Sequence, residues 1–146
     1  MFLYGSILKL THYVKVIPFT VRVQTFLNSA TAMVDIETVR RLALSFPETD
    51  EHAHFERKAF RVKKKIFATL SEKEKTVNVM LSPVDQSVFC SFDKTVIYPV
   101  AGGWGLKGAT TVNLQKVKKS MLKDALTTAY CKAAPPKLAA KFISRE

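Results

Sequence analysis

The sequence predicts an α+β domain in which an antiparallel β-meander packs against helices. Between residues 55 and 81, apolar and polar residues alternate in short runs separated by charged turns, a pattern typical of antiparallel strands. On either side of that region, apolar residues repeat at helical spacing over residues 35–45 and 117–132,. The length of 146 residues and the apolar fraction of 47% fit one domain with a substantial core.

The first predicted helix covers about residues 35 to 45. Asp35 suits its N-cap, and Pro47 ends it because a residue that precedes proline avoids helical geometry,,. Its apolar face contains Val39, Leu42, Ala43 and Phe46.

Charged turns at residues 56–58, 63–65 and 71–75 separate the predicted strands. The strand residues expected to alternate with polar ones are Phe55, Ala59, Phe60, Val62, Ile66, Phe67, Ala68, Leu70, Val77, Val79 and Leu81. Because the gaps are short, consecutive strands are expected to pair with each other.

The second half begins with Ser82-Pro83, an N-cap followed by proline at the first helical position,. This helix is expected to reach about Phe92, and an extended piece follows at 96–100. Residues 101–108 hold four of the five glycines and are predicted to form a loop. A last strand is expected at 110–114.

The amphipathic helix at 117–132 directs apolar residues to one side. Lys116, Lys118, Lys119 and Lys123 lie outside that apolar face. After Pro135 and Pro136, a short helical tail is expected at 138–143.

The N-terminal segment differs in composition, because its first 34 residues carry no acidic residue. It is consistent with a targeting peptide, with an extra strand around Pro18, or with translation that really begins at Met33,. We favour the third. Residues 1–32 are then an extension of doubtful structure, and residues 33–146 form the single domain.

The charge is strongly basic: 23 Lys and Arg face 12 Asp and Glu, giving a net charge of +11. Such an excess favours polyanionic partners, nucleic acid above all. No apolar run approaches the roughly 18 residues that a membrane span needs. Cys90 and Cys131 lack a CxxC spacing, which fits reduced thiols and a cytoplasmic location.

Catalytic and metal-binding patterns are missing from the sequence. Gly103 to Gly108 has the glycine spacing of a phosphate-binding loop, but Ala109 stands where that loop needs lysine,. His52, His54 and Glu56 alternate on a possible strand, and three such ligands rarely close a tetrahedral site. We therefore expect no enzyme activity, no metal and no cofactor.

The candidate nucleic-acid-binding residues begin with Arg61, Lys63, Lys64 and Lys65, a cluster at a predicted hairpin. A hairpin tip of this kind reaches a phosphate backbone, as in winged modules. The alternative is a solvated turn whose lysines protect a strand edge. Lys107, Lys116 and Lys119 extend the predicted patch.

Trp104, the single tryptophan, lies in the glycine-rich segment. It is a candidate ligand-binding residue, because an exposed tryptophan gives a base a surface to stack on. The alternative, and the commoner arrangement, is an anchor folded back onto the core.

The order of motifs resembles the MmcQ/YjbR family over residues 33 to about 140. The matching motifs are residues 35–47, His54-Phe55-Glu56, residues 59–62, residues 65–70, Leu81-Ser82-Pro83, residues 102–105 with 110–112, and residues 133–138. The resemblance implies a frataxin-like (CyaY-like) α+β fold, described as a double wing, and a DNA-binding role. It brings no catalytic residue.

We therefore expect a non-enzymatic DNA-binding protein. The rivals are a small-ligand or protein-binding module at Trp104 and the sheet, and an enzyme in which His52, His54 and Glu56 converge.

Overall fold

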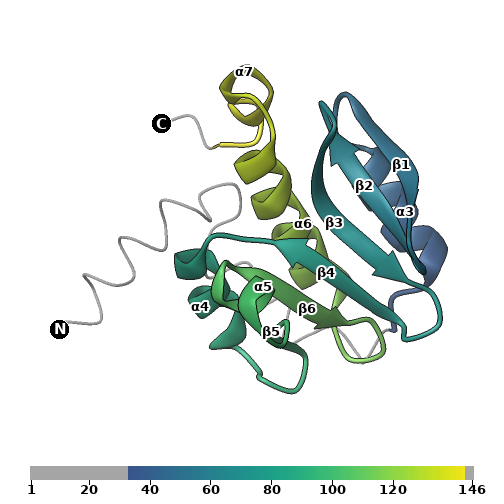
Figure 1. Cartoon of the computed structure of the whole chain (residues 1–146), viewed down its shortest axis with the longest axis vertical. Helices are drawn as coiled ribbons and strands as arrows, with labels where there is room; N and C mark the ends of the chain where they lie inside the picture. Colours follow the sequence, from purple (N-terminus) through teal and green to yellow (C-terminus); the bar gives the residue numbers. More distant parts are fainter. Residues whose placement is uncertain (1–32, 144–146) are drawn as a thin grey trace, which may run out of the picture.

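The computed structural model describes residues 33–143 (Figure 1). The extension expected at residues 1–32 lies outside the described residues. The helices are α3 (Ile36–Leu44), α4 (Pro83–Cys90), α5 (Gly103–Leu106), α6 (Lys119–Ala133) and α7 (Pro136–Ala139). The strands are β1 (Thr49–His54), β2 (Arg57–Val62), β3 (Lys65–Ser71), β4 (Thr76–Met80), β5 (Ile97–Pro99) and β6 (Ala109–Asn113).

All six strands described here form one antiparallel sheet in the order β1-β2-β3-β4-β6-β5. The first four strands are the meander that the alternating pattern predicts. Strand β6 then pairs with β4, and β5 lies at the edge. The α+β class and the antiparallel meander are thus confirmed.

One face of this sheet packs against helix α6, which contacts β3 and β4 and passes behind β4 in Figure 1. The apolar side of α6 predicted from the sequence is buried. The stacked rings of Tyr130 and Phe46 lie 4.6 Å apart, with Phe67 edge-on to both. The Tyr130 hydroxyl donates a hydrogen bond of 2.9 Å to the Pro47 carbonyl, which ties the end of α3 to α6.

The two predicted N-caps are present. The Asp35 carboxylate accepts a hydrogen bond from the Thr38 amide at 2.6 Å, and the Ser82 hydroxyl accepts one from the Asp85 amide at 3.1 Å. Both satisfy backbone N–H groups that a helix start leaves without a partner.

A bulge bends the middle of the sheet. Phe60 pairs with Ala68 and Arg61 with Ile66, so Phe67 is an additional residue on β3. Bulges bend and twist a strand, and β3 pairs with β4 only from Ala68 onward. The β2–β3 hairpin therefore diverges from β4 and rises at the top of Figure 1, while α5 lies at the lower left.

Two local predictions were wrong. Phe55 is not a strand residue but lies in the turn after β1, because the register pairs His54 with Arg57. The glycine-rich segment is not only a loop, since it contains the short helix α5. In the part of the chain described here, no helix has the length and apolar character to cross a membrane.

Candidate nucleic-acid interface

The tip of the β2–β3 hairpin consists of Lys63 and Lys64, because Val62 pairs with Lys65. Both tip residues have positive φ, 49° and 69°, as in the tight hairpin turns that favour asparagine and glycine. A side chain in this left-handed region costs roughly 1 kcal/mol per residue. Lys63 and Lys64 therefore occupy two positions at which asparagine or glycine would make the turn more stable.

Acidic neighbours neutralise part of this hairpin. Arg61 donates to both oxygens of the Asp50 carboxylate at 2.8 and 3.2 Å, and these hydrogen bonds, together with the charge of Arg61, lower the pKa of Asp50. The Lys63 ammonium lies 2.8 Å from Glu48 Oε1. Lys64 and Lys65 are exposed and form no salt bridge within residues 33–143. Of the predicted cluster, these two are the cations available to a phosphate.

A second group, the α6 lysine cluster, comprises Lys116, Lys118, Lys119 and Lys123 at the start of α6. Lys118 is the N-cap residue and makes no side-chain cap bond, and the first turn of α6 holds no acidic residue. Cations at this positive end of a helix dipole are unfavourable in isolation. A bound anion reverses the sign of that interaction.

The predicted site residues do not form a single patch. Lys65 begins β3, and Ser71 ends it. Ser71 pairs with Thr76 on β4, and Thr76 pairs with Asn113 on β6, which lies close to the α6 lysine cluster. At 3.3 Å per residue, the length of β3 separates the two groups by roughly 20 Å. Lys107 lies in a third place, after α5, with its ammonium 5.5 Å from the centre of the Trp104 ring.

Trp104 is 69% exposed, so the anchor interpretation was wrong. Glycines hold the segment in place instead. A Cβ on Gly105 would lie 1.8 Å from the Val100 carbonyl oxygen, and one on Gly108 would lie 1.9 Å from that of Leu81. Backbone therefore packs directly on backbone, and the indole is left outside.

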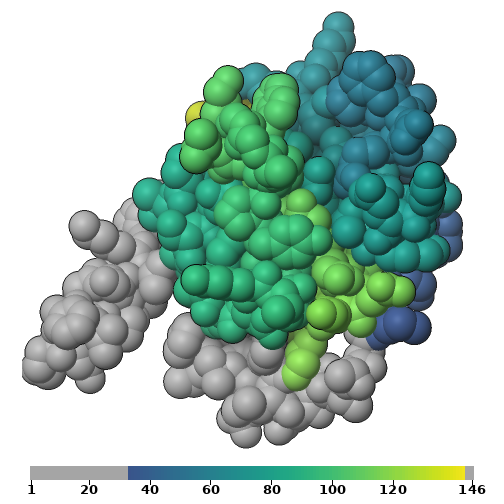
Figure 2. Space-filling view, turned by 60° about the horizontal axis from the view of Figure 1, so that its bottom comes forward, coloured from purple at the N-terminus to yellow at the C-terminus, as the bar shows by residue number. Residues whose placement is uncertain are grey.

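The side-chain amide of Gln86 also holds the glycine-rich segment against α4. Gln86 Nε2 on α4 donates to the carbonyl oxygens of Gly105 and Ala109 at 2.9 and 3.0 Å. Leu106, on the same short helix, is 83% exposed, and Tyr98 on β5 is 37% exposed. The segment around α5 stands out from the body at the top of Figure 2, coloured bright green.

Phe55 is a second exposed aromatic residue, and the sequence reasoning missed it. Its side chain is 95% exposed, its φ is 55°, and its ring lies 4.9 Å from that of His54. The run Phe-Glu-Arg contains no glycine, asparagine or proline to indicate a turn, so no local signal identified this position.

The convergence of His52, His54 and Glu56 that the rival enzyme hypothesis requires is not formed. Strand β1 ends at His54, and Glu56 lies in the following turn, so the three side chains do not share one strand face. His52 and Glu56 are exposed. Within the described residues, no three His, Cys, Asp or Glu side chains are placed to hold a metal ion.

The two cysteines are free and half-buried. Burial raises the pKa of Cys131 to about 11 and also raises that of Cys90. Because the thiolate is the nucleophile, neither position favours reactivity at neutral pH.

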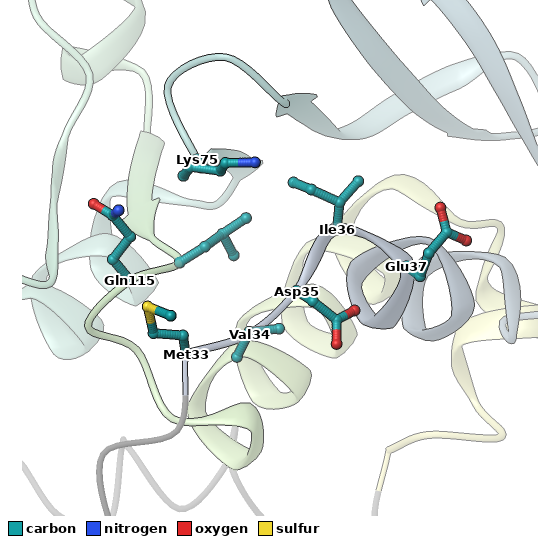
Figure 3. Close-up of a pocket in the computed structure, with 8 residues that line it drawn as sticks. Met33, Val34, Asp35, Ile36, Glu37, Lys75 and Gln115 are labelled. Carbon is teal, nitrogen blue, oxygen red and sulfur yellow. The ribbon is translucent and has the colours of Figure 1, made fainter.

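A pocket of about 650 Å³ lies between the start of α3 and the segment before α6 (Figure 3). Its lining consists of Met33, Val34, Asp35, Ile36, Glu37, Lys75, Leu114 and Gln115. None of the predicted site residues is among them. With two carboxylates and one ammonium, this lining does not suit a polyanion.

The sheet order and helix arrangement define a small α+β domain with two diverging β-units. The sequence profile of the YjbR family matches residues 44–132, more than half of the chain, and the chain belongs to that family. It is also similar in fold to the crystal structure of the Deinococcus radiodurans protein DR2400, whose family-model domain is DUF419. That likeness has a TM-score of 0.60 at 16% identity and covers 80% of this chain and 100% of that one. The comparison with curated proteins finds no match.

Proposed function

We propose that this YjbR-family chain is a non-catalytic DNA-binding protein that contacts the phosphate backbone through the β2–β3 tip and the α6 lysine cluster. The distribution of charge carries the proposal. Between Lys94 and Lys123 the chain has six basic and no acidic residues, a net +6 within a total of +11. These residues are Lys94, Lys107, Lys116, Lys118, Lys119 and Lys123.

The location of these lysines supports the same reading. They lie before β5, after α5, after β6 and at the start of α6, so the excess of basic residues belongs to the β5–β6 part of the chain and the start of α6. A surface of one charge sign attracts a polyanion and releases its condensed counterions on binding. The lysines would also supply no base-edge specificity, since phosphate contacts position a protein without reading sequence.

The β2–β3 tip supports phosphate contact independently. Two lysines retain left-handed backbone where asparagine or glycine would be more stable,. Strained residues of this kind concentrate at functional sites. The tip also projects away from β4, so a duplex can approach it without meeting the body of the domain.

Three charge-reversal pairs on exposed lysines test the proposal: K64E/K65E in the β2–β3 hairpin, K116E/K119E in the α6 lysine cluster, and K137E/K141E near α7 as a control with the same change in net charge. Affinity for a labelled 16-base-pair duplex is measured by fluorescence anisotropy from 50 to 200 mM salt. The wild-type log affinity should fall linearly with log salt. Each of the first two pairs should flatten that slope by about two, at 0.9 per phosphate contact, and the control should not.

Equal losses in all three variants would show that net charge alone attracts DNA and would contradict the assigned surfaces. Absence of duplex and single-strand binding at 50 mM salt would end the DNA-binding proposal. As part of the same proposal we place the protein in the cytoplasm, where the free thiols of Cys90 and Cys131 stay reduced,.

A second function, binding of a small ligand or a protein, is favoured by one observation: Trp104 and Leu106 are both strongly exposed on α5. Aromatic residues of this kind anchor protein interfaces. Binding at Trp104 that is independent of salt would favour this function over DNA binding.

A further inference from the structure

We infer that Trp104 is a stacking platform for an unpaired base, which makes single-stranded nucleic acid a ligand of the α5 surface. This inference rests on the proposed function, because it assigns a ligand class to the surroundings of Lys107, one of the basic residues that support that proposal. Here the α5 surface means Trp104 and Lys107 together with Tyr98 on β5.

The presentation of Trp104 is built into the backbone. Gly105 and Gly108 meet the carbonyl groups of Val100 and Leu81 too closely to accept a side chain, and Gln86 bonds to the Gly105 carbonyl. These three contacts hold the backbone around α5 against the body of the domain, with the indole on the outside. A fixed aromatic ring gives a base a defined plane on which to stack.

The charge around the ring indicates what covers it. Lys107 lies 5.5 Å from the ring centre, and the nearest acidic residues along the chain are Asp93 and Asp124. The ammonium lies over one face of the ring, so a base stacked on the other face would keep its phosphate close to a cation. An aromatic ring together with a positively charged groove is the usual composition of single-strand binding sites.

Tyr98 adds a second aromatic residue on the same edge of the sheet. It pairs with Thr111, whose hydroxyl donates to Asn78 Oδ1 at 2.9 Å. In an antiparallel sheet such paired residues point to the same face, so Tyr98 lies on the face opposite the core residues Val77, Val79 and Val112. This face carries Met80 and Ala109 at the end near α5, and the hydrogen-bonding side chains of Asn78 and Thr111 further along β4 and β6.

The experiment compares the full chain with Trp104→Ala, Trp104→Phe and, as a matched control, Leu106→Ala, the truncation of another strongly exposed apolar side chain on the same helix. Affinity for labelled 15-nucleotide oligothymidylate is measured by anisotropy, and Trp104 emission is followed in the wild type. We expect Trp104→Ala to weaken binding by roughly five- to a hundredfold with an unchanged salt slope. Trp104→Phe should retain most of the affinity, Leu106→Ala should bind within about twofold of the wild type, and oligothymidylate should quench the emission.

Circular dichroism melting checks that each variant is folded. If Trp104→Ala binds oligothymidylate as the wild type does, or if emission is unchanged at saturation, the inference fails while salt-dependent binding leaves the proposed function standing. Polyglutamate of equal charge that quenches the emission as strongly would also overturn it, because polyglutamate offers charge without bases. If the wild type binds no nucleic acid, the proposed function and the inference fail together.

Discussion

At the scale of single residues, Gly105 controls the presentation of Trp104. A Cβ at this position would meet the Val100 carbonyl oxygen at 1.8 Å, whereas one on Gly103 has no heavy atom within 4 Å. We expect Gly105→Ala to lower the free energy of unfolding by about 2 kcal/mol or more, since backbone must move to admit the methyl group. Gly103→Ala, in the same short helix, should be neutral or slightly stabilising.

Urea unfolding followed by circular dichroism gives both values. Equal stability of the two alanine variants would mean that α5 is not fixed by backbone contact, and the exposure of Trp104 would then need another cause.

Residues also set the limit of what the sequence predicts about the site. The tip lysines could be located because the strands on either side alternate clearly, so the turn between them is bounded on both sides. The orientation of Trp104 could not, since it depends on contacts of Gly105 and Gly108 with residues on other elements. An exposed ring also loses the roughly 2 kcal/mol of stabilisation that burial would give. Hydrophobic patterning therefore predicts a buried tryptophan here.

At the scale of elements, hydrophobic periodicity was a good guide to helices and strands. Helices α3 and α6 and strands β2, β3 and β4 follow it, because each buries one face against a common core. The same reasoning misplaced Phe55, whose apolar character suggested a strand. It could not foresee the bulge at Phe67 either, because that residue is buried like its neighbours. A bulge is decided by pairing, not by composition.

Helix α4 provides a prediction about pH. Asp85 is buried in its first turn, accepts a hydrogen bond of 2.8 Å from the Ser82 hydroxyl, and has a pKa raised above its ordinary 3.8 mainly by burial. A raised carboxyl pKa means that ionisation costs folded-state stability. The stability contributed by the protonated Asp85 carboxyl is fully present below pH 3.8 and is lost as the pH rises through the pKa of Asp85 in the folded protein.

Asp85→Asn removes this titration while it keeps an oxygen for the Ser82 hydroxyl. The free energy of unfolding of the wild type, measured relative to Asp85→Asn, should therefore fall as pH rises from 3 to 7. If the free energies of unfolding of the wild type and Asp85→Asn differ by the same amount at every pH in this range, the carboxyl has an ordinary pKa in the folded protein.

At the scale of the whole molecule, the sheet decides how basic residues are distributed. From the sequence, the lysines at positions 63–65 and those at 116, 118 and 119 were expected to form one patch. The register places them roughly 20 Å apart, at opposite ends of β3. Pairing between distant strands fixed this separation, and it has no signature in local spacing.

A single duplex must then be long enough to reach both surfaces. At 3.4 Å per base pair, roughly 20 Å corresponds to about six base pairs, so a DNA hairpin with a four-base-pair stem can occupy the β2–β3 tip or the α6 lysine cluster but not both. We expect the salt slope of the wild type to steepen when the stem is lengthened from four to sixteen base pairs, because additional phosphates are neutralised. K64E/K65E and K116E/K119E should each lose that steepening, since only one surface remains. If K64E/K65E steepens as the wild type does, the tip and α6 do not engage the same duplex, and the α6 side of the sheet binds DNA without the hairpin.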